Sequence, residues 1–151
     1  MPKVTVSDTS CLILFYKIGE LDLLKDLFGK IHITETVSKE FSQSLPDWVE
    51  VKKPTSGLDK GLASYLDPGE ATSIALASEE SNSLLIIDEI KGRKAATEMG
   101  VTITGSLGVL VTAKRKGHIQ AVKPLIKKML QTNFWISQEL VDRVLQIVDE
   151  T

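Results

Sequence analysis

The chain has 151 residues, of which 42% are hydrophobic and 25% charged, and its formal net charge is −2. These values are those of ordinary globular proteins, so they exclude collagen-like, coiled-coil and disordered classes and fit one domain over residues 1–151. The single cysteine, Cys11, excludes an intramolecular disulfide and a cysteine-based zinc site. Because the sequence has no signal-like start and no run of roughly 18 apolar residues, we expect a soluble, cytoplasmic protein.

The first half of the chain predicts strands that alternate with helices. Short apolar runs between polar residues indicate the strands, and apolar residues at helical spacing indicate the helices. In chain order these are a strand that starts at 4 and ends at the polar run 7–10, one or two helices over 12–28 with a break near Gly19, a strand over 31–33, a helix that begins at 34, an edge strand or loop over 49–51, and a helix over about 57–65. Thr34 is the expected N-cap of its helix, because its hydroxyl can accept a hydrogen bond from a free backbone N–H.

The second half of the chain predicts the same alternation. The continuous apolar run Leu-Leu-Ile-Ile at 84–87 is typical of a strand covered on both faces in a parallel sheet. In chain order the elements are a helix over 71–78 opened by Asp-Pro-Gly-Glu at 67–70, the strand over 84–87, a helix over about 89–99, a strand over 101–103, and helices over about 106–116, 122–131 and 137–149. This order predicts a three-layer α/β fold with a mostly parallel central sheet.

Four acidic residues stand where the loops of such a sheet converge. Asp8 and Asp88 each follow an apolar strand run, and the carboxyl ends of parallel strands share one edge of the sheet. Glu40 and Glu70 lie on helices that can flank the same crevice. Four carboxylates in one place repel one another unless a cation lies among them, and an oxygen-rich set suits Mg²⁺ or Mn²⁺ rather than zinc. Their joint placement therefore favours a divalent-metal site.

Each of these acids also has a local explanation. Asp8 and Asp88 could serve only as helix N-caps, Glu70 could be a partner of the helix dipole, and Glu40 could face solvent. The metal-site hypothesis depends on all four meeting. If Asp8 and Asp88 do meet, removing either charge by Asp→Asn should leave the metal-free stability unchanged or improved.

Other polar and aromatic residues each have two interpretations. Ser10 either holds a water or phosphate oxygen or caps a helix, and Ser106 either presents backbone N–H groups to a phosphate or follows a tight turn at the preceding glycine. Trp48 and Trp135 either stack on bases or pack in the core or an interface. A basic stretch is either a solvated face or a contact for a polyanion, and consists of Lys114, Arg115, Lys116, His118, Lys123, Lys127 and Lys128.

Several segments resemble the PIN-domain superfamily, in the same order and over nearly the whole chain. They are Val-Thr-Val-Ser-Asp-Thr-Ser at 4–10, Ile-Thr-Glu-Thr-Val-Ser-Lys-Glu-Phe at 33–41, Asp-Pro-Gly-Glu-Ala at 67–71, and Leu-Leu-Ile-Ile-Asp at 84–88. The Gly-Glu-Ala motif at 69–71 and the Gly-Ser-Leu-Gly turn at 105–108 are similar to a prokaryotic, VapC-like branch. Two departures are Glu70, where the usual signature has an aspartate, and Ile-Ile-Asp at 86–88, where it has Thr-x-Asp.

The resemblance implies a metal-dependent ribonuclease. It implies that Asp8, Glu40, Glu70 and Asp88 are the catalytic residues and the ligands of Mg²⁺ or Mn²⁺. RNA is then the substrate, and a toxin role implies a small antitoxin protein as partner, with a homodimer as a further arrangement found among PIN relatives. The alternative is a catalytically weak module on the same fold that binds nucleic acid or protein.

Two other classes of aspartate-dependent protein fit the sequence less well. A phosphotransferase of the haloacid dehalogenase type needs a second acid two positions after the first, where this chain has Ser10. A receiver domain needs an acidic pair near the first strand, and the nearest acids that follow Asp8 are Glu20 and Asp22.

Overall fold

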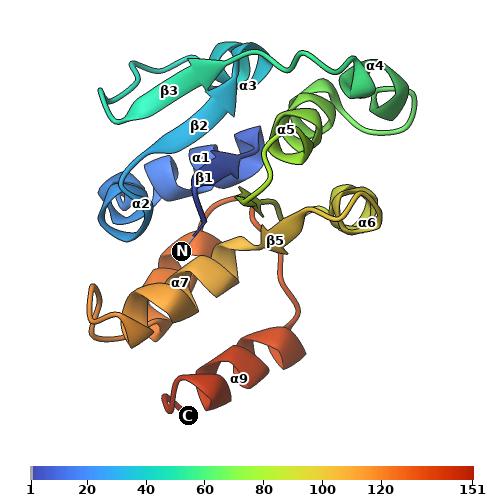
Figure 1. Cartoon of the computed structure of the whole chain (residues 1–151). Coiled ribbons are helices and arrows are strands. Elements are labelled where there is room, and N and C mark those ends of the chain that lie inside the picture. The colour runs from blue at the N-terminus through green and yellow to red at the C-terminus, as the bar shows by residue number, and fades with distance from the viewer. Residues whose placement is uncertain (1) are drawn as a thin grey trace.

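The computed structural model of the protein describes residues 2–151, so the expected domain start at residue 1 lies outside the described part (Figure 1). Its sheet has the strand order β3-β2-β1-β4-β5, and every pair of neighbouring strands is parallel. The strands are β1 (Val4–Ser7), β2 (Ile31–Thr34), β3 (Val49–Lys52), β4 (Ser83–Ile86) and β5 (Thr102–Thr104). The parallel sheet with helices between its strands confirms the predicted three-layer α/β fold.

The helices alternate with the strands up to β5 and then close the chain. They are α1 (Thr9–Lys17), α2 (Leu21–Phe28), α3 (Glu35–Phe41), α4 (Leu58–Leu62), α5 (Pro68–Ser78), α6 (Ile90–Glu98), α7 (Ser106–Arg115), α8 (Lys123–Leu130) and α9 (Gln138–Ile147). Thr34 caps α3 as expected, because its hydroxyl accepts the Val37 N–H at 3.2 Å. Within residues 2–151, no helix is long and apolar enough to cross a membrane.

Two apolar clusters cover the two faces of the sheet. One cluster joins Ile31, Ile33 and Ile86 to α1, α2, α7, α8 and α9. The other joins Val6 and Leu85 to α5 and α6 on the opposite face. Alternate residues of one strand point to opposite faces, which is why neighbours such as Leu85 and Ile86 belong to different clusters. The sheet is therefore held between two helical layers, and its carboxyl edge is left for polar residues.

Two segments of the first half of the chain differ in how the structure answers the sequence: one was open and is now assigned, and one expected helix is shorter. Residues 49–51 belong to an edge strand, β3, which pairs only with β2 in the described sheet. The helix expected over about 57–65 is shorter, since α4 ends at Leu62. Gly61 lies inside this helix, and a glycine there loses more conformational entropy than any other residue, which weakens a short helix.

A partly buried ionic contact joins Glu150, near the end of the chain, to Lys114 of α7 and the start of α8. Glu150 accepts the backbone N–H groups of Val122 and Lys123 at 2.7 and 2.9 Å, and the Lys114 ammonium at 2.9 Å. Burial opposes the charge of this carboxylate, but the three donors outweigh it and hold the pKa of Glu150 below its ordinary value. Lys114 also donates to the carbonyl of Val148, so this member of the basic stretch is engaged within the fold.

We expect Glu150→Gln to destabilise the protein by about 2 kcal/mol at pH 7, because three donors lose a charged acceptor. Since the folded pKa of Glu150 is lowered, its contribution is present above the ordinary glutamate pKa and is lost as the pH falls through the folded value. Urea unfolding at pH 7 measures the effect. The control is Glu98→Gln on the exposed face of α6, which should change stability by less than about 0.5 kcal/mol. Equal stability of both variants would contradict the structural role of Glu150.

Candidate metal and active site

Asp8 lies at the junction of β1 and α1. It directly follows the strand and is the N-cap of the helix, where its Oδ1 accepts the Cys11 N–H at 2.9 Å. The Asp8 N–H donates to the carbonyl of Ile86 in the neighbouring strand β4. Only 1% of Asp8 is exposed. The local capping role and the position at the carboxyl edge of the sheet are therefore both real for this residue.

Asp88 lies at the same edge, beyond β4, and is held by the first residue of α7. Its Oδ1 accepts the Ser106 backbone N–H at 2.8 Å, and its Oδ2 accepts the Ser106 hydroxyl at 2.6 Å. Gly105 passes so close that a Cβ there would lie 2.7 Å from Asp88 Oδ1. The glycine is therefore needed for the approach of the backbone to the carboxylate.

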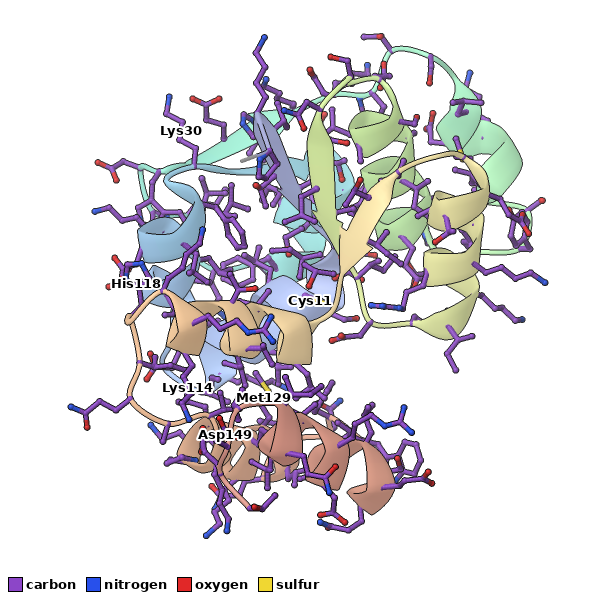
Figure 2. All side chains as sticks on the ribbon, turned by 60° about the horizontal axis from the view of Figure 1, so that its bottom comes forward. Cys11, Lys30, Lys114, His118, Met129 and Asp149 are labelled. Carbon is purple, nitrogen blue, oxygen red and sulfur yellow. The ribbon has the colours of Figure 1, made fainter. Side chains whose placement is uncertain are left out.

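Cys11 links these two aspartates. Its backbone N–H donates to Asp8, and its thiol lies 3.3 Å from Asp88 Oδ2 and 3.4 Å from the Ser106 hydroxyl. Figure 2 labels Cys11 where α1 passes the start of α7. Burial, followed by the charges of Asp8 and Asp88, raises the pKa of the Cys11 thiol well above its ordinary value, so this group stays protonated and acts as a donor.

Glu70 lies in the first turn of α5 and is 7% exposed. The N-cap of this helix is Asp67, whose Oδ1 accepts the Glu70 N–H at 2.9 Å. The pKa of Glu70 is raised to about 7, mainly by burial. The charge of Asp67 and a hydrogen bond between Glu70 and Asp67 also raise it, followed by the charges of Glu89 and Asp8. Glu70 is thus within the electrostatic reach of three other carboxylates.

Glu40 joins the group through Thr9 rather than through another carboxylate. Its Oε1 accepts the Thr9 hydroxyl at 2.5 Å, next to Asp8 in the chain. A Cβ at Gly69 would lie 2.5 Å from both of these oxygens, so the start of α5 packs directly on the pair. Glu40 itself is exposed on α3. It therefore lies at the open rim of the site, while Asp8 and Glu70 lie inside.

Burial raises the pKa of Asp8 to about 7, although the hydrogen bonds from Cys11 act against it, and the charges of Asp88 and Asp67 add to the increase. Near neutral pH, Asp8 and Glu70 are therefore partly protonated unless a cation lies beside them. The donor set consists of carboxylate oxygens, which are the ligands that Mg²⁺ and Mn²⁺ prefer. The residues thus fit such an ion in chemistry and in charge.

The side-chain positions fit the ion less closely than the chemistry does. Among residues 2–151, no three Asp, Glu, His or Cys side chains are near enough to one another to hold one ion as they stand. A third ligand would have to come from a rotated side chain. Glu40 at the rim has the freedom to rotate, because its carboxylate is attached through three rotatable bonds and, within residues 2–151, is held by a single hydrogen bond from the Thr9 hydroxyl.

The other residues singled out from sequence have clear positions. Ser10 is exposed on the first turn of α1 and does not cap it, because Asp8 does. Ser106 gives both its backbone N–H and its hydroxyl to Asp88, so these donors orient a carboxylate rather than a phosphate. Trp48 is buried, whereas Trp135 is 82% exposed. The basic stretch begins in the last turn of α7, at the other end of this helix from Ser106.

Three residues of the site were missed in the sequence. Asp67 and Glu89 are the N-caps of α5 and α6. A capping position explains an acid locally, so the sequence alone gives no reason to group either residue with the four. The N-cap of α6 is therefore Glu89 and not Asp88. Cys11 stands three residues after Asp8, the spacing at which an N-cap side chain meets a backbone N–H, and this spacing was the available signal.

A comparison with protein families decides the assignment. The model of the family DUF3368, described as a PIN domain, matches residues 4–150. The chain belongs to this PIN-domain family. No curated protein and no solved structure matches it. The family match confirms the resemblance to the PIN superfamily and indicates a nuclease-type function in general; it does not bear on the VapC-like branch.

Proposed function

We propose that this PIN domain is a metal-dependent endoribonuclease that uses Mg²⁺ or Mn²⁺. The observation that supports it most is the meeting of Asp8 and Asp88 through Cys11 at the carboxyl edge of the sheet. The raised pKa of Asp8 and of Glu70, each to about 7, adds support, because a buried acidic group of this kind is stabilised by a cation.

Asp8 and Asp88 would hold the ion directly, and Glu40 and Glu70 would hold it through water or after rotation of their side chains. When bound, the ion lowers the pKa of the attacking water and offsets charge on the phosphate oxygens. The protein's own part is orientation. Cys11 fixes one oxygen of Asp8, and Ser106 fixes both oxygens of Asp88, so neither aspartate has to be ordered when the substrate binds.

Asp8→Asn should reduce the cleavage rate of single-stranded RNA by at least about 100-fold, because a metal ligand loses its charge. The assay uses RNA of mixed sequence with Mn²⁺, and EDTA should abolish cleavage by the unchanged protein. A circular RNA tests internal cleavage, since it offers no ends. Asp26→Asn, an exposed aspartate on α2, is the matched control and should cleave at the original rate.

Cleavage that survives Asp8→Asn or EDTA would contradict the proposal. A toxin role in a toxin–antitoxin pair is the finer form of it, supported by the resemblance of residues 69–71 and 105–108 to the VapC-like branch. In that case, expression of the unchanged protein arrests bacterial growth and expression of the Asp8→Asn variant does not.

The second candidate is a module that binds nucleic acid or protein without cleaving. One observation favours it: within residues 2–151, three ligating side chains are not yet close enough to hold an ion. The same assay separates the two candidates. Binding of single-stranded RNA without Mn²⁺-dependent cleavage supports the module, and cleavage lost in Asp8→Asn supports the enzyme.

A further inference from the structure

A large groove opens beside the candidate metal site. Its volume is about 930 Å³, and its walls come from α6, from β5 with α7, and from α9 with the segment that precedes it. Asp88 lines one part of the groove, so the groove is continuous with the carboxylate group. A substrate bound at Asp88 would therefore extend into this space.

The groove carries the two most exposed large hydrophobic side chains of the described chain. Trp135, between α8 and α9, is 82% exposed, and Ile90, at the start of α6, is 80% exposed. Both line the groove. A tryptophan in water leaves a large flat apolar surface without a partner, and such surfaces gathered around a hollow mark a binding site.

Two arginines line the same groove. Arg93 donates to the carbonyl of Ile87 at 2.8 Å, which holds its guanidinium near Asp88, and Arg115 lies at the C-terminal end of α7. Neither arginine is in an ion pair within residues 2–151. The acid Glu89 also lines the groove, but its carboxylate accepts the Gly92 N–H at the cap of α6.

The combination of charge and shape indicates the occupant. An apolar groove alone would suit a helix of another protein, but this groove has guanidinium groups toward both ends of α7 and a carboxylate site at its margin. Single-stranded nucleic acid has the matching chemistry, because its bases stack on aromatic side chains and its phosphates bind arginine. A base-paired helix would keep its bases stacked on one another and away from Trp135.

We propose that the groove is a nucleobase subsite, in which an unpaired nucleotide next to the phosphate at Asp88 stacks its base on Trp135 and places its own phosphate at Arg115. This inference rests on the proposed function, since it takes RNA as the substrate. It adds that recognition extends beyond the carboxylates to the segment before α9. It also adds that the site selects unpaired RNA.

The experiment measures RNA binding in EDTA, so that cleavage does not enter. A labelled single-stranded oligoribonucleotide is titrated with the unchanged protein, and with Trp135→Ala and Trp135→Phe. We expect Trp135→Ala to weaken binding by about 5- to 100-fold and Trp135→Phe to retain most of the affinity, because phenylalanine keeps a stacking face. Tyr65→Ala, an exposed aromatic residue outside the groove, is the control and should bind like the unchanged protein.

Tryptophan fluorescence gives a second readout. The chain has two tryptophans, and Trp48 is buried, so a change on binding reports Trp135. Single-stranded RNA should quench it and a duplex of the same sequence should not. An oligonucleotide that lacks one base should bind the unchanged protein more weakly than the complete oligonucleotide does. The Trp135→Ala variant should bind the two oligonucleotides with equal affinity.

Three results would overturn the proposal. The first is equal affinity of Trp135→Ala and the unchanged protein for single-stranded RNA, and the second is equal quenching by duplex. The third is loss of a dimer in Trp135→Ala with RNA binding unchanged, measured by sedimentation, which would make the groove a protein interface. If RNA binding depends on Trp135 but the protein shows no Mn²⁺-dependent cleavage, the nuclease proposal fails and the subsite stands. If the protein cleaves RNA but binding does not depend on Trp135, only the subsite is rejected.

Discussion

Asp8→Asn is expected to stabilise the metal-free protein by about 2–4 kcal/mol at pH 8, with the gain shrinking toward zero as the pH approaches 4. Asp8 is 1% exposed, and its pKa is raised from 3.8 to about 7 mainly by burial. Each pKa unit corresponds to about 1.4 kcal/mol, so the full charge costs about 4 kcal/mol in the fold, less any relaxation. Asparagine avoids this cost and keeps the oxygen that accepts the Cys11 N–H.

The direction of the pH dependence follows from where the proton is held. Because the folded pKa of Asp8 lies above the unfolded one, the folded state binds more protons between these two values. The free energy of unfolding therefore falls as the pH rises from about 4 to about 7, and it levels off above. Glu70, whose pKa is also raised to about 7, contributes in the same direction.

Urea unfolding in EDTA between pH 5 and pH 8 measures this difference. Asp26→Asn on the surface of α2 is the matched control and should follow the unchanged protein at every pH. An Asp8→Asn variant that is less stable than the unchanged protein at pH 8, or whose advantage does not vary with pH, would show that the charge of Asp8 is already compensated. Adding Mn²⁺ at pH 8 should stabilise the unchanged protein and not the variant.

Local patterns were sufficient for most of the fold. The β-branched residues before Asp8 and the continuous apolar run at 84–87 identified the two central strands, because a strand buried on both faces must be apolar throughout. Thr34 and Pro68 located the starts of α3 and α5 through capping chemistry. The edge strand β3 could not be decided from sequence, since its burial alternates only in part and its stability comes from pairing with β2.

The site was less predictable than the fold, because it depends on contacts between distant segments. The meeting of Asp8 and Asp88 followed from the rule for parallel sheets. The link between them through Cys11 did not, since it joins residues 77 positions apart. Likewise, the position of Ser106 at a helix start fits both a phosphate contact and a tight turn, and only its approach to Asp88 shows that its N–H is already used.

This approach makes Asp88 respond differently from Asp8. Sequence pattern led to the same expectation for both, that removing the charge leaves the metal-free stability unchanged or improved. We now expect Asp88→Asn to destabilise the protein by about 1–3 kcal/mol in EDTA at pH 8. Its two oxygens accept the N–H and the hydroxyl of Ser106 at the start of α7, and hydrogen bonds to a charged acceptor of this kind are worth more than neutral ones.

Asp88→Asn has two opposing effects on the free energy of unfolding. Removing the charge relieves repulsion with Asp8, but Asp88 is a smaller cause of the raised Asp8 pKa than burial is. Against that gain, asparagine is neutral, so Ser106 loses its charged acceptor and the N-terminus of α7 loses an anion that favours its dipole. The losses exceed the gain, and the sign is opposite to that of Asp8→Asn.

A double-mutant cycle with Ser106→Ala tests this assignment. Each single variant should be less stable than the unchanged protein, and the double variant should lose less than the sum, because both changes remove the same contact. Thr97→Ala, on the exposed face of α6, combined with Asp88→Asn should be additive. If Asp88→Asn instead raises the unfolding free energy as Asp8→Asn does, repulsion among the carboxylates outweighs the hydrogen bonds from Ser106.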